Sequence, residues 1–244
     1  MRECSKSIPR RLTQSNFALR YFKGRGIDIG GKPDPLSLYA HLFSGITGIR
    51  VWDLEDGDAQ FMAGIADESV DFVHSSHCLE HMHDPLVALQ NWLRITRPGG
   101  FLIITVPDED LYEQGQFPST FNPDHKTSFT MWKPSSWAPR SVNVLDLVRR
   151  LGSAARPEKI ELLDATYRYD LPRYDQTRTP IGECAIEIVL RKAGADEIAA
   201  GGRVRSAVQP PAELRRHYNQ YAADGRTLKA ANAGAPPFQD STEL

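Results

Sequence analysis

The stretch that decides the fold is Val70 to Asp108, VDFVHSSHCLEHMHDPLVALQNWLRITRPGGFLIITVPD. An apolar run, Val70 to Val73, ends in small polar residues, and a second apolar run spans Phe101 to Val106. Between them leucines recur at helical spacing until Pro98-Gly99-Gly100 interrupts the pattern. A strand, a helix and a second strand in this order are typical of a parallel sheet.

Further strands are predicted on both sides of this unit. Upstream, short apolar runs cover Gly26 to Gly30 and Gly48 to Asp53. Downstream, Lys159 to Tyr169 and Glu183 to Lys192 are two β-type runs, which we expect to pair antiparallel at one side of the sheet. The sequence therefore predicts an α/β fold with a Rossmann-like, doubly wound sheet that is mostly parallel, with an antiparallel strand pair near the C-terminal end of the domain.

The connecting segments are predicted as helices and one long loop. Helical patterns cover Thr13 to Lys23, Pro35 to Phe43 and Val142 to Leu151. The loop runs from Asp108 to Pro139, and loops of this length are usually functional or mobile. Its aromatic side chains are predicted either to form a lid or acceptor pocket or to pack the loop onto the sheet; they are Tyr112, Phe117, Phe121, Phe129, Trp132 and Trp137.

Composition narrows the class of protein without naming it. The 244 residues are enough for one α/β domain and an extra segment, and a net charge of -2 gives no drive toward nucleic acid. The arginines, including Arg10 and Arg11, are expected on solvated faces. The cysteines have neither disulfide nor zinc spacing, and no signal peptide or bilayer-spanning run is evident, so a cytoplasmic location is expected. The oligomeric state is not predicted.

Glycines and carboxylates follow the first two predicted strands. The first strand ends in Asp28-Ile29-Gly30-Gly31 and the second ends at Asp53, with Asp58-Ala59 shortly after. Ligands of open parallel sheets bind beyond the carboxyl ends of the strands, and a carboxylate there can accept both hydroxyls of a ribose. The simpler interpretation is that the glycines only form a turn and that Asp53 only caps a helix or turn.

The residues after the first strand favour one cofactor over another. Dinucleotides need G-x-G-x-x-G before a helix, whereas this chain has Gly30-Gly31-Lys32-Pro33-Asp34-Pro35. The Asp34 carboxylate would also repel a pyrophosphate. S-adenosylmethionine carries no phosphate and is cationic, so carboxylates suit it. An NAD-dependent dehydrogenase is therefore the least favoured enzyme.

The chain resembles the class I S-adenosylmethionine-dependent methyltransferases of the small-molecule type (methyltransferase type 11-like). The resemblance is carried by GIDIGG, VWD, DGDA and the stretch that opens this section, and it covers about Gly24 to Lys192. It implies S-adenosyl-L-methionine as the cofactor, with the methionine moiety near Asp28 and Gly30, the ribose at Asp53, the adenine amine near Asp58 and the sulfonium near Ser76 and His77. The full predicted set of cofactor-binding residues is Asp28, Gly30, Gly31, Asp53, Asp58, Ala59, Ser76 and His77.

The same resemblance sets the predicted domain bounds, and the chain departs from the family's pattern in two places. A helical lead-in covers 1–23, the methyltransferase domain 24–192, and a flexible Ala/Gly/Pro-rich tail 193–244. The family's third glycine is absent from GIDIGG, because Lys32 and Pro33 follow. Only residues 54–69 separate Asp53 from the next strand, which is too short for the family's usual helix, strand and helix. The edge of the sheet is therefore expected to be reduced.

Histidines cluster on the expected acceptor side. His77 and His125 are the predicted catalytic residues. Some relatives, such as small-RNA 2′-O-methyltransferases, hold a divalent metal with an E-x-x-E-H group and, in that case, a distal His. This chain has His77-x-x-Glu80-His81 and His125, and imidazole in place of the first carboxylate suits softer ions than magnesium. We predict no metal requirement, with His77, Glu80, His81 and His125 as the candidate ligands; otherwise Glu80 and His81 only shape a helix start.

The predicted function is transfer of a methyl group from S-adenosylmethionine to a small-molecule, glycan or lipid-linked acceptor, at oxygen. Two alternatives remain open. A metal-assisted nucleic-acid 2′-O-methyltransferase predicts a metal at the four candidate ligands together with a basic channel. A catalytically silent partner subunit predicts cofactor binding without turnover, or no binding.

Overall fold

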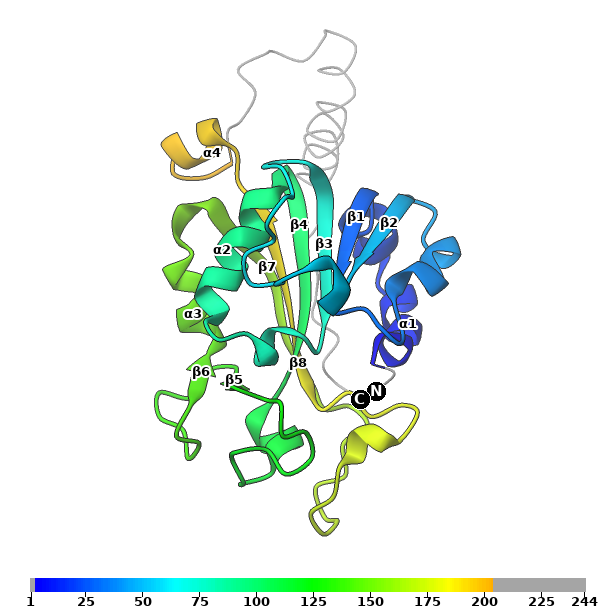
Figure 1. Cartoon of the computed structure of the whole chain (residues 1–244), viewed down its shortest axis with the longest axis vertical. Helices are drawn as coiled ribbons and strands as arrows, with labels where there is room; N and C mark the ends of the chain where they lie inside the picture. The colour runs from blue at the N-terminus through cyan, green and yellow to red at the C-terminus, as the bar shows by residue number, and fades with distance from the viewer. Residues whose placement is uncertain (1–2, 204–244) are drawn as a thin grey trace, which may run out of the picture. The chain divides into compact units, whose positions relative to one another are not determined.

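A six-stranded sheet in the order β2-β1-β3-β4-β8-β7 forms the centre of the computed structural model, which describes residues 3–203 (Figure 1). The first four strands are mutually parallel, and β8 runs antiparallel to both β4 and β7. This arrangement confirms the predicted fold class. The strands are β1 (Gly24–Ile29), β2 (Ile46–Trp52), β3 (Val70–Ser76), β4 (Thr96–Pro107), β7 (Ala155–Leu163) and β8 (Ala185–Lys192).

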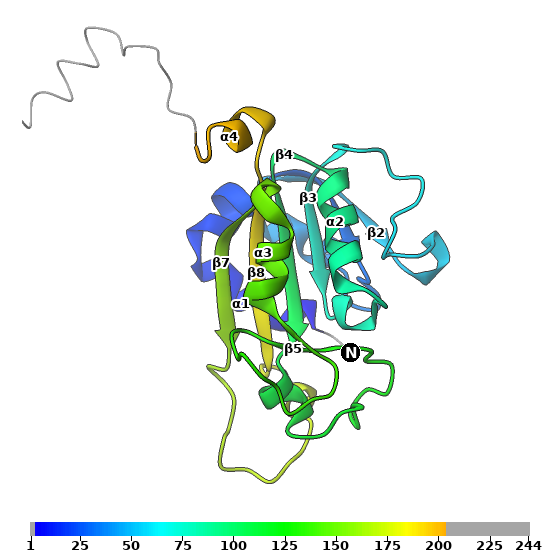
Figure 2. The ribbon, with the colours of Figure 1, turned by 90° about the vertical axis from the view of Figure 1, so that its left-hand side faces the viewer.

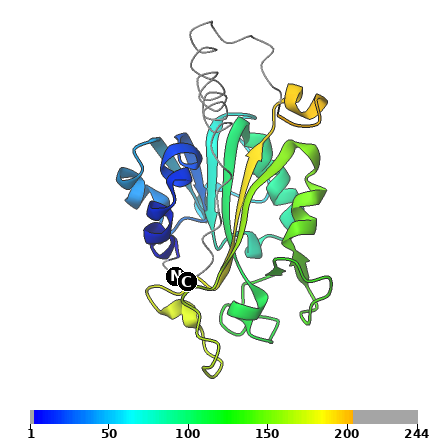
Figure 3. The ribbon, with the colours of Figure 1, turned by 180° about the vertical axis from the view of Figure 1, so that it is seen from behind.

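Helices cover both faces of the sheet. The helices α2 (Pro85–Ile95) and α3 (Val144–Arg150) lie on one face, and α1 (Cys4–Thr13) lies on the other (Figures 2 and 3). The side chains of β4 alternate between the two cores: Leu102 and Ile104 pack on the α2 side, while Phe101 and Ile103 pack on the α1 side. This alternation is what a strand buried on both faces requires.

The remaining elements are short and connect the layers. Most are single turns of helix, and β5 and β6 form a small parallel pair within and after the predicted long loop. They are η1 (Phe17–Tyr21), η2 (Leu36–Leu42), η3 (Leu54–Asp56), η4 (Leu79–His81), η5 (Glu109–Glu113), β5 (Ser128–Thr130), β6 (Ser141–Asn143), η6 (Gly152–Ala154), η7 (Gln176–Arg178) and α4 (Ala195–Ala199).

Helix α2 fixes the loop that follows β2. It begins at the Asp84 cap, whose carboxylate accepts the Leu86 and Val87 backbone N–H groups at 2.9 and 3.2 Å, with Pro85 at the first helical position. Trp92 on its buried face donates its indole N–H to the Ala59 carbonyl at 2.8 Å. The segment that carries Asp58 and Ala59 is therefore anchored to the core.

The sheet ends at β2, as the short segment between β2 and β3 predicts. Within residues 54–69 the structure has one short helical turn, η3, and otherwise turns and irregular backbone. The edge of the sheet is reduced to β2. Among the helices of residues 3–203, none has the length and apolar character needed to cross a bilayer.

One expectation about the N-terminal segment is wrong and another is incomplete. The helical turn η1 lies within the predicted Thr13 to Lys23 helix, but α1 precedes it, since burial of Ile8 against the sheet outweighs the helix-breaking effect of Pro9. Arg11 is completely buried rather than solvated, because its guanidinium pairs with the buried Glu187 carboxylate at 2.9 Å. Most of the predicted 193–244 tail lies outside the described residues.

Candidate functional site

Two cavities open at the carboxyl ends of β1, β2 and β3. The larger, of about 610 Å³, lies beside Trp52, Asp53 and the Asp58-Ala59 segment. The smaller, of about 180 Å³, lies between the end of β3 and the loop that carries His125. Both cavities are lined by Gly30, Lys32, His77 and His81. The two cavities therefore adjoin at the topological switch point of the sheet, where ligands of such folds bind.

The Gly30-Gly31 turn shapes the boundary between the cavities. Gly30 has φ +68°, and a Cβ there would lie 2.6 Å from both Cβ and Sγ of Cys78. Its N–H donates to the Trp52 carbonyl at 2.8 Å, which holds the turn against the end of β2. Glycine is thus required at position 30 by conformation and by space.

Asp53 both caps η3 and faces the larger cavity. Its carboxylate accepts the Leu54 N–H at 2.9 Å and the Lys32 N–H at 3.0 Å, so it joins the ends of β1 and β2. Asp58 accepts the Gln60 N–H at 2.8 Å and lines the same cavity. Because a carboxylate oxygen has two acceptor sites, these backbone bonds leave capacity for a ligand's hydroxyl or amine groups.

Asp28 belongs to a buried charged network. Its carboxylate accepts the Leu36 N–H at 2.7 Å and lies 2.5 Å from Nδ1 of His74. The other ring nitrogen, Nε2, lies 2.9 Å from the Arg11 guanidinium. Since a guanidinium only donates, His74 Nε2 accepts, and Nδ1–H donates to Asp28. Asp28 lines the smaller cavity, but these bonds also fix the loop after β1.

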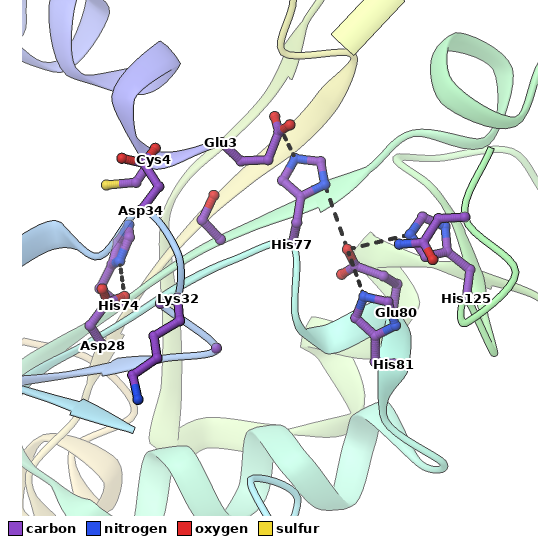
Figure 4. A pocket seen from close by; sticks show the side chains of 14 residues that line it. Glu3, Cys4, Asp28, Lys32, Asp34, His74, His77, Glu80, His81 and His125 are labelled. Atoms are coloured by element: carbon purple, nitrogen blue, oxygen red, sulfur yellow. Dashed lines mark hydrogen bonds and ion pairs between the residues drawn. The ribbon is translucent and has the colours of Figure 1, made fainter. Parts of the chain in front are cut away.

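Three histidines surround one buried glutamate in the smaller cavity (Figure 4). Oε1 of Glu80 lies 3.5 Å from His77 Nδ1, 3.8 Å from His125 Nε2 and 4.0 Å from His81 Nε2. The Glu80 side chain is fully buried, and neither of its oxygens has a hydrogen-bond partner among the described residues. We call His77, Glu80, His81 and His125 the histidine–glutamate cluster.

Backbone contacts bring the members of the cluster together. His77 follows β3 directly, with φ +54°, and its N–H donates to the Thr105 carbonyl of β4 at 2.9 Å. Glu80 and His81 lie on η4. The Lys126 N–H donates to the Glu80 carbonyl at 2.9 Å, which holds the loop bearing His125 against η4.

Burial disfavours charge throughout the cluster. Burial raises the pKa of Glu80 to about 7. Burial also lowers the pKa of His77 to about 3, and repulsion from His125 lowers it further. Burial also lowers the pKa of His81. The imidazoles of His77 and His81 are therefore neutral near neutral pH, with a lone pair on one ring nitrogen of each.

The predicted site residues divide between the two cavities. Asp53, Asp58 and Ala59 line the larger one, and Gly30 and His77 line both. The smaller cavity is lined by the other predicted residues, Asp28, Gly31, Ser76 and His125, and by residues that sequence reasoning missed, notably Glu3, Asp34, His74 and Asn122. His74 had a usable signal, as a polar residue in an otherwise buried strand, whereas Glu3 had none.

The aromatic residues of the long loop line neither cavity. Tyr112 and Phe129 are buried in the loop's own packing and in the core, and Trp132 is 63% exposed. For Tyr112 and Phe129 the self-packing interpretation holds. The loop instead contributes polar residues to the cavities: Asn122, Asp124, His125 and Lys126.

Comparisons with known proteins find similarity to methyltransferases. Residues 40–104 match the model of a family described as a methyltransferase domain, and this range includes Asp53, Asp58 and the first three members of the cluster. A proposed methyltransferase of Bacillus halodurans is 15% identical with a TM-score of 0.50, over 76% of this chain and 98% of that one. A proposed S-adenosylmethionine-dependent methyltransferase of Listeria monocytogenes is 14% identical with a TM-score of 0.50, over 79% and 99%. No curated protein matches the chain.

The sheet order and these likenesses show that the chain has the Rossmann-like fold of S-adenosylmethionine-dependent methyltransferases. Residues 40–104 carry the sequence pattern of a methyltransferase domain.

Proposed function

We propose that this enzyme transfers a methyl group from S-adenosylmethionine to a hydroxyl oxygen of a small-molecule, glycan or lipid-linked acceptor. The observation that carries the proposal is the junction of the two cavities at Gly30, Lys32, His77 and His81. The larger cavity has a volume typical of cofactor sites, which are roughly 300–1,000 Å³. The smaller one is lined by polar groups and adjoins it where the reacting methyl group would lie.

The larger cavity suits the adenosyl part of the cofactor. Asp53 would accept the ribose hydroxyls, and Asp58 with Ala59 would contact the adenine amine. The methionine part would extend past Gly30 and Gly31 toward Asp28 and Ser76, which brings the sulfonium to His77. The Asp53 and Asp58 carboxylates line this cavity, and they favour a cationic ligand without phosphate.

The smaller cavity suits a polar acceptor. Its lining includes the side chains of Glu3, Ser76, Asn122 and His125, which can hydrogen-bond to hydroxyl groups. His77 and His125 would hold the reacting hydroxyl in line with the methyl group. In the reaction the oxygen–carbon bond forms, the carbon–sulfur bond breaks, S-adenosylhomocysteine leaves, and one proton is released. Positioning and exclusion of water supply most of the rate increase in such a displacement.

The nucleic-acid alternative receives partial support. The four residues that it requires converge in the cluster. It also requires a basic channel, but the Lys and Arg residues that line the two cavities are Lys32 and Lys126. The acidic residues of the same linings outnumber them and include Glu3, Asp28, Asp53, Asp58 and Asp124. This excess of acidic over basic side chains favours a small polar acceptor over the anionic phosphodiester backbone of a nucleic acid.

A calorimetric titration tests the proposal at its first step. The full-length chain is titrated with S-adenosylmethionine, S-adenosylhomocysteine and NAD. We expect micromolar binding of the two adenosyl ligands and none of NAD. A screen of hydroxyl-bearing small molecules and sugars then follows formation of S-adenosylhomocysteine. Binding without turnover across the screen would favour the silent partner subunit, and no adenosyl binding would refute the proposal.

Two further expectations accompany this function. We propose residues 24–192 as the methyltransferase domain proper and a cytoplasmic location for the enzyme. Fractionation of cells that express the natural chain tests the location.

A further inference from the structure

We propose that the histidine–glutamate cluster binds one divalent transition-metal cation, held by Glu80, His81 and His125, with His77 beside it. Binding of the ion stands on the cluster alone, whereas any part that the ion plays in methyl transfer rests on the proposed function.

The first argument is the unpaired carboxylate of Glu80. Its side chain is fully buried, and both oxygens lack a hydrogen-bond partner among residues 3–203. Within that part of the chain the basic side chains with a nitrogen within 4.0 Å of it are the three histidines; no Lys or Arg nitrogen is that close. Burying a carboxylate without compensation costs several kcal/mol.

The second argument is the spacing of the ligand atoms. The three nitrogen–oxygen distances of 3.5, 3.8 and 4.0 Å are too long for hydrogen bonds. The distances to His125 and His81, 3.8 and 4.0 Å, are slightly longer than the edge of a tetrahedron with metal–ligand bonds of about 2.1 Å, which measures about 3.4 Å. One ligand atom from each of Glu80, His81 and His125 lies within 4.8 Å of the others. These atoms therefore need only small movements to share one ion.

The third argument is the hydrogen bonding of the imidazoles away from the cluster. His81 Nδ1 lies 3.1 Å from the Asp124 carbonyl, which can only accept, so His81 donates there and keeps the lone pair of Nε2. His125 Nδ1 lies 2.8 Å from the Glu113 carboxylate, so its Nε2 lone pair also faces Glu80. A ring nitrogen that donates to a carbonyl or carboxylate is the usual support of a metal-bound histidine.

His77 borders the three-residue group of Glu80, His81 and His125 without belonging to it. Its Nδ1 faces Glu80, and its Nε2 lies 3.8 Å from the Glu3 carboxylate, so the ring is also bracketed by acids (Figure 4). The Glu3 carboxylate is held in turn by Lys6 at 2.8 Å. Because His77 and His81 line both cavities, the ion's open coordination position would face their junction.

The donor set selects the kind of ion. Two imidazoles and one carboxylate suit Zn²⁺ and neighbouring first-row ions such as Fe²⁺ and Co²⁺. Mg²⁺ prefers oxygen ligands and retains several waters, so this set disfavours it. We therefore expect a clear preference for Zn²⁺ and Co²⁺ over Mg²⁺.

The test measures metal binding without any methyl transfer. The full-length chain, freed of affinity tag and stripped with a chelator, is titrated with Zn²⁺ by calorimetry and with Co²⁺ by visible absorption. We expect one ion per chain and a cobalt spectrum of low-coordinate geometry. Glu80→Gln and His81→Ala should each weaken binding at least about 100-fold, and Glu113→Gln about 10- to 100-fold through His125. His41→Ala, which removes an exposed imidazole outside the cluster, should leave binding unchanged.

Several outcomes would overturn the inference. They are absence of stoichiometric binding in the folded chain, an octahedral cobalt spectrum that the cluster variants do not alter, or equal loss in His41→Ala. Circular dichroism checks that each variant is folded, and His81→Ala serves if Glu80→Gln is not, because His81 is partly exposed. S-adenosylmethionine is titrated separately. Metal binding without cofactor binding would refute the proposed function alone, and the converse would refute this inference alone.

Discussion

Arg11 and Glu187 form an ion pair of 2.9 Å in which neither side chain has any solvent exposure. The same Arg11 guanidinium donates to His74, which in turn donates to Asp28 beside the smaller cavity. A contact between α1 and β8 thus determines how the loop after β1 is held. Arg10 and Lys159 also bond Glu187, at 2.8 Å each, so this carboxylate compensates several cations.

Glu187→Gln should destabilise the fold strongly. The substitution leaves Arg11 buried without its counter-charge, and breaking a buried pair in this way costs about 3–5 kcal/mol. Urea unfolding followed by circular dichroism measures the change. Asp146→Asn serves as the control, because Asp146 pairs with Arg149 where both are exposed, and such pairs contribute about 0–1 kcal/mol. Equal effects of the two substitutions would contradict the assigned role.

The same glutamate predicts how stability depends on pH. Burial alone would raise the pKa of Glu187, but Arg11, Arg10 and Lys159 outweigh it and hold the pKa well below its ordinary value of 4.5. The unfolded chain therefore takes up this proton first as the pH falls. The stabilisation is complete above about pH 4.5 and is lost progressively below it. The difference in unfolding free energy between the natural chain and Glu187→Gln should narrow from pH 5 to pH 3; a constant difference would be the contrary result.

Local patterns in the sequence were sufficient to predict most strands of the sheet. The apolar runs that predict β1 to β4 and β8 depend on neighbouring residues, and the short 54–69 segment correctly predicted a reduced edge. Helix α1 was missed since its stability comes from packing on the sheet, and that contact outweighs the local effect of Pro9. The burial of Arg11 could not be predicted, because its partner is 176 residues away in the chain.

The candidate site likewise has residues whose proximity the sequence predicted and contacts that it did not predict. His77, Glu80 and His81 are close in sequence, so their proximity followed from spacing, and His125 was chosen as a distal histidine. The sequence did not predict that Glu80 is the fully buried centre of the cluster, nor that Glu113 supports His125. Both facts depend on how the loop after β4 folds back on η4 through the Lys126 and Thr127 N–H groups.

Gly30→Ala should destabilise the turn between the two cavities. The new Cβ would lie 2.6 Å from Cys78 and would occupy a φ of +68°. Gly64→Ala is a matched control, because Gly64 has φ +80° but open space around its Cβ position. We expect Gly64→Ala to lower the free energy of unfolding by about 1–2 kcal/mol, because the left-handed backbone conformation disfavours a side chain. The loss should be larger for Gly30→Ala, where the new Cβ also meets Cys78. Thermal unfolding compares the two variants.

A cofactor titration extends this comparison. Gly30→Ala should also weaken S-adenosylmethionine binding, since Gly30 lines both cavities, whereas Gly64→Ala should not. Equal stability and equal affinity in the two variants would mean that the turn adapts to a side chain.

Asp53→Ala should weaken cofactor binding by about 1–3 kcal/mol if its carboxylate accepts the ribose hydroxyls. Its loss also removes the bond to Lys32 N–H, so the loop after Gly31 loses one restraint. Calorimetry with S-adenosylhomocysteine measures the change. Asp67→Ala, which removes an exposed carboxylate that lines neither cavity, should bind as the natural chain does. Unchanged affinity in Asp53→Ala would remove this residue from the site.

His125→Ala should slow methyl transfer while leaving cofactor affinity unchanged. His125 lines the smaller cavity alone and is held by the Glu113 carboxylate, so its loss affects the acceptor rather than the adenosyl part. Loss of one positioning contact at a reacting centre costs about 100-fold in rate. The rate of S-adenosylhomocysteine formation with an acceptor found by screening measures this. The His125 ring also packs against the Tyr112 ring, with 5.1 Å between the ring centroids. Because the substitution removes this contact, a thermal melting curve is measured alongside the assay. A large fall in melting temperature would assign His125 a structural role, and an unchanged rate in a folded variant would exclude it from catalysis.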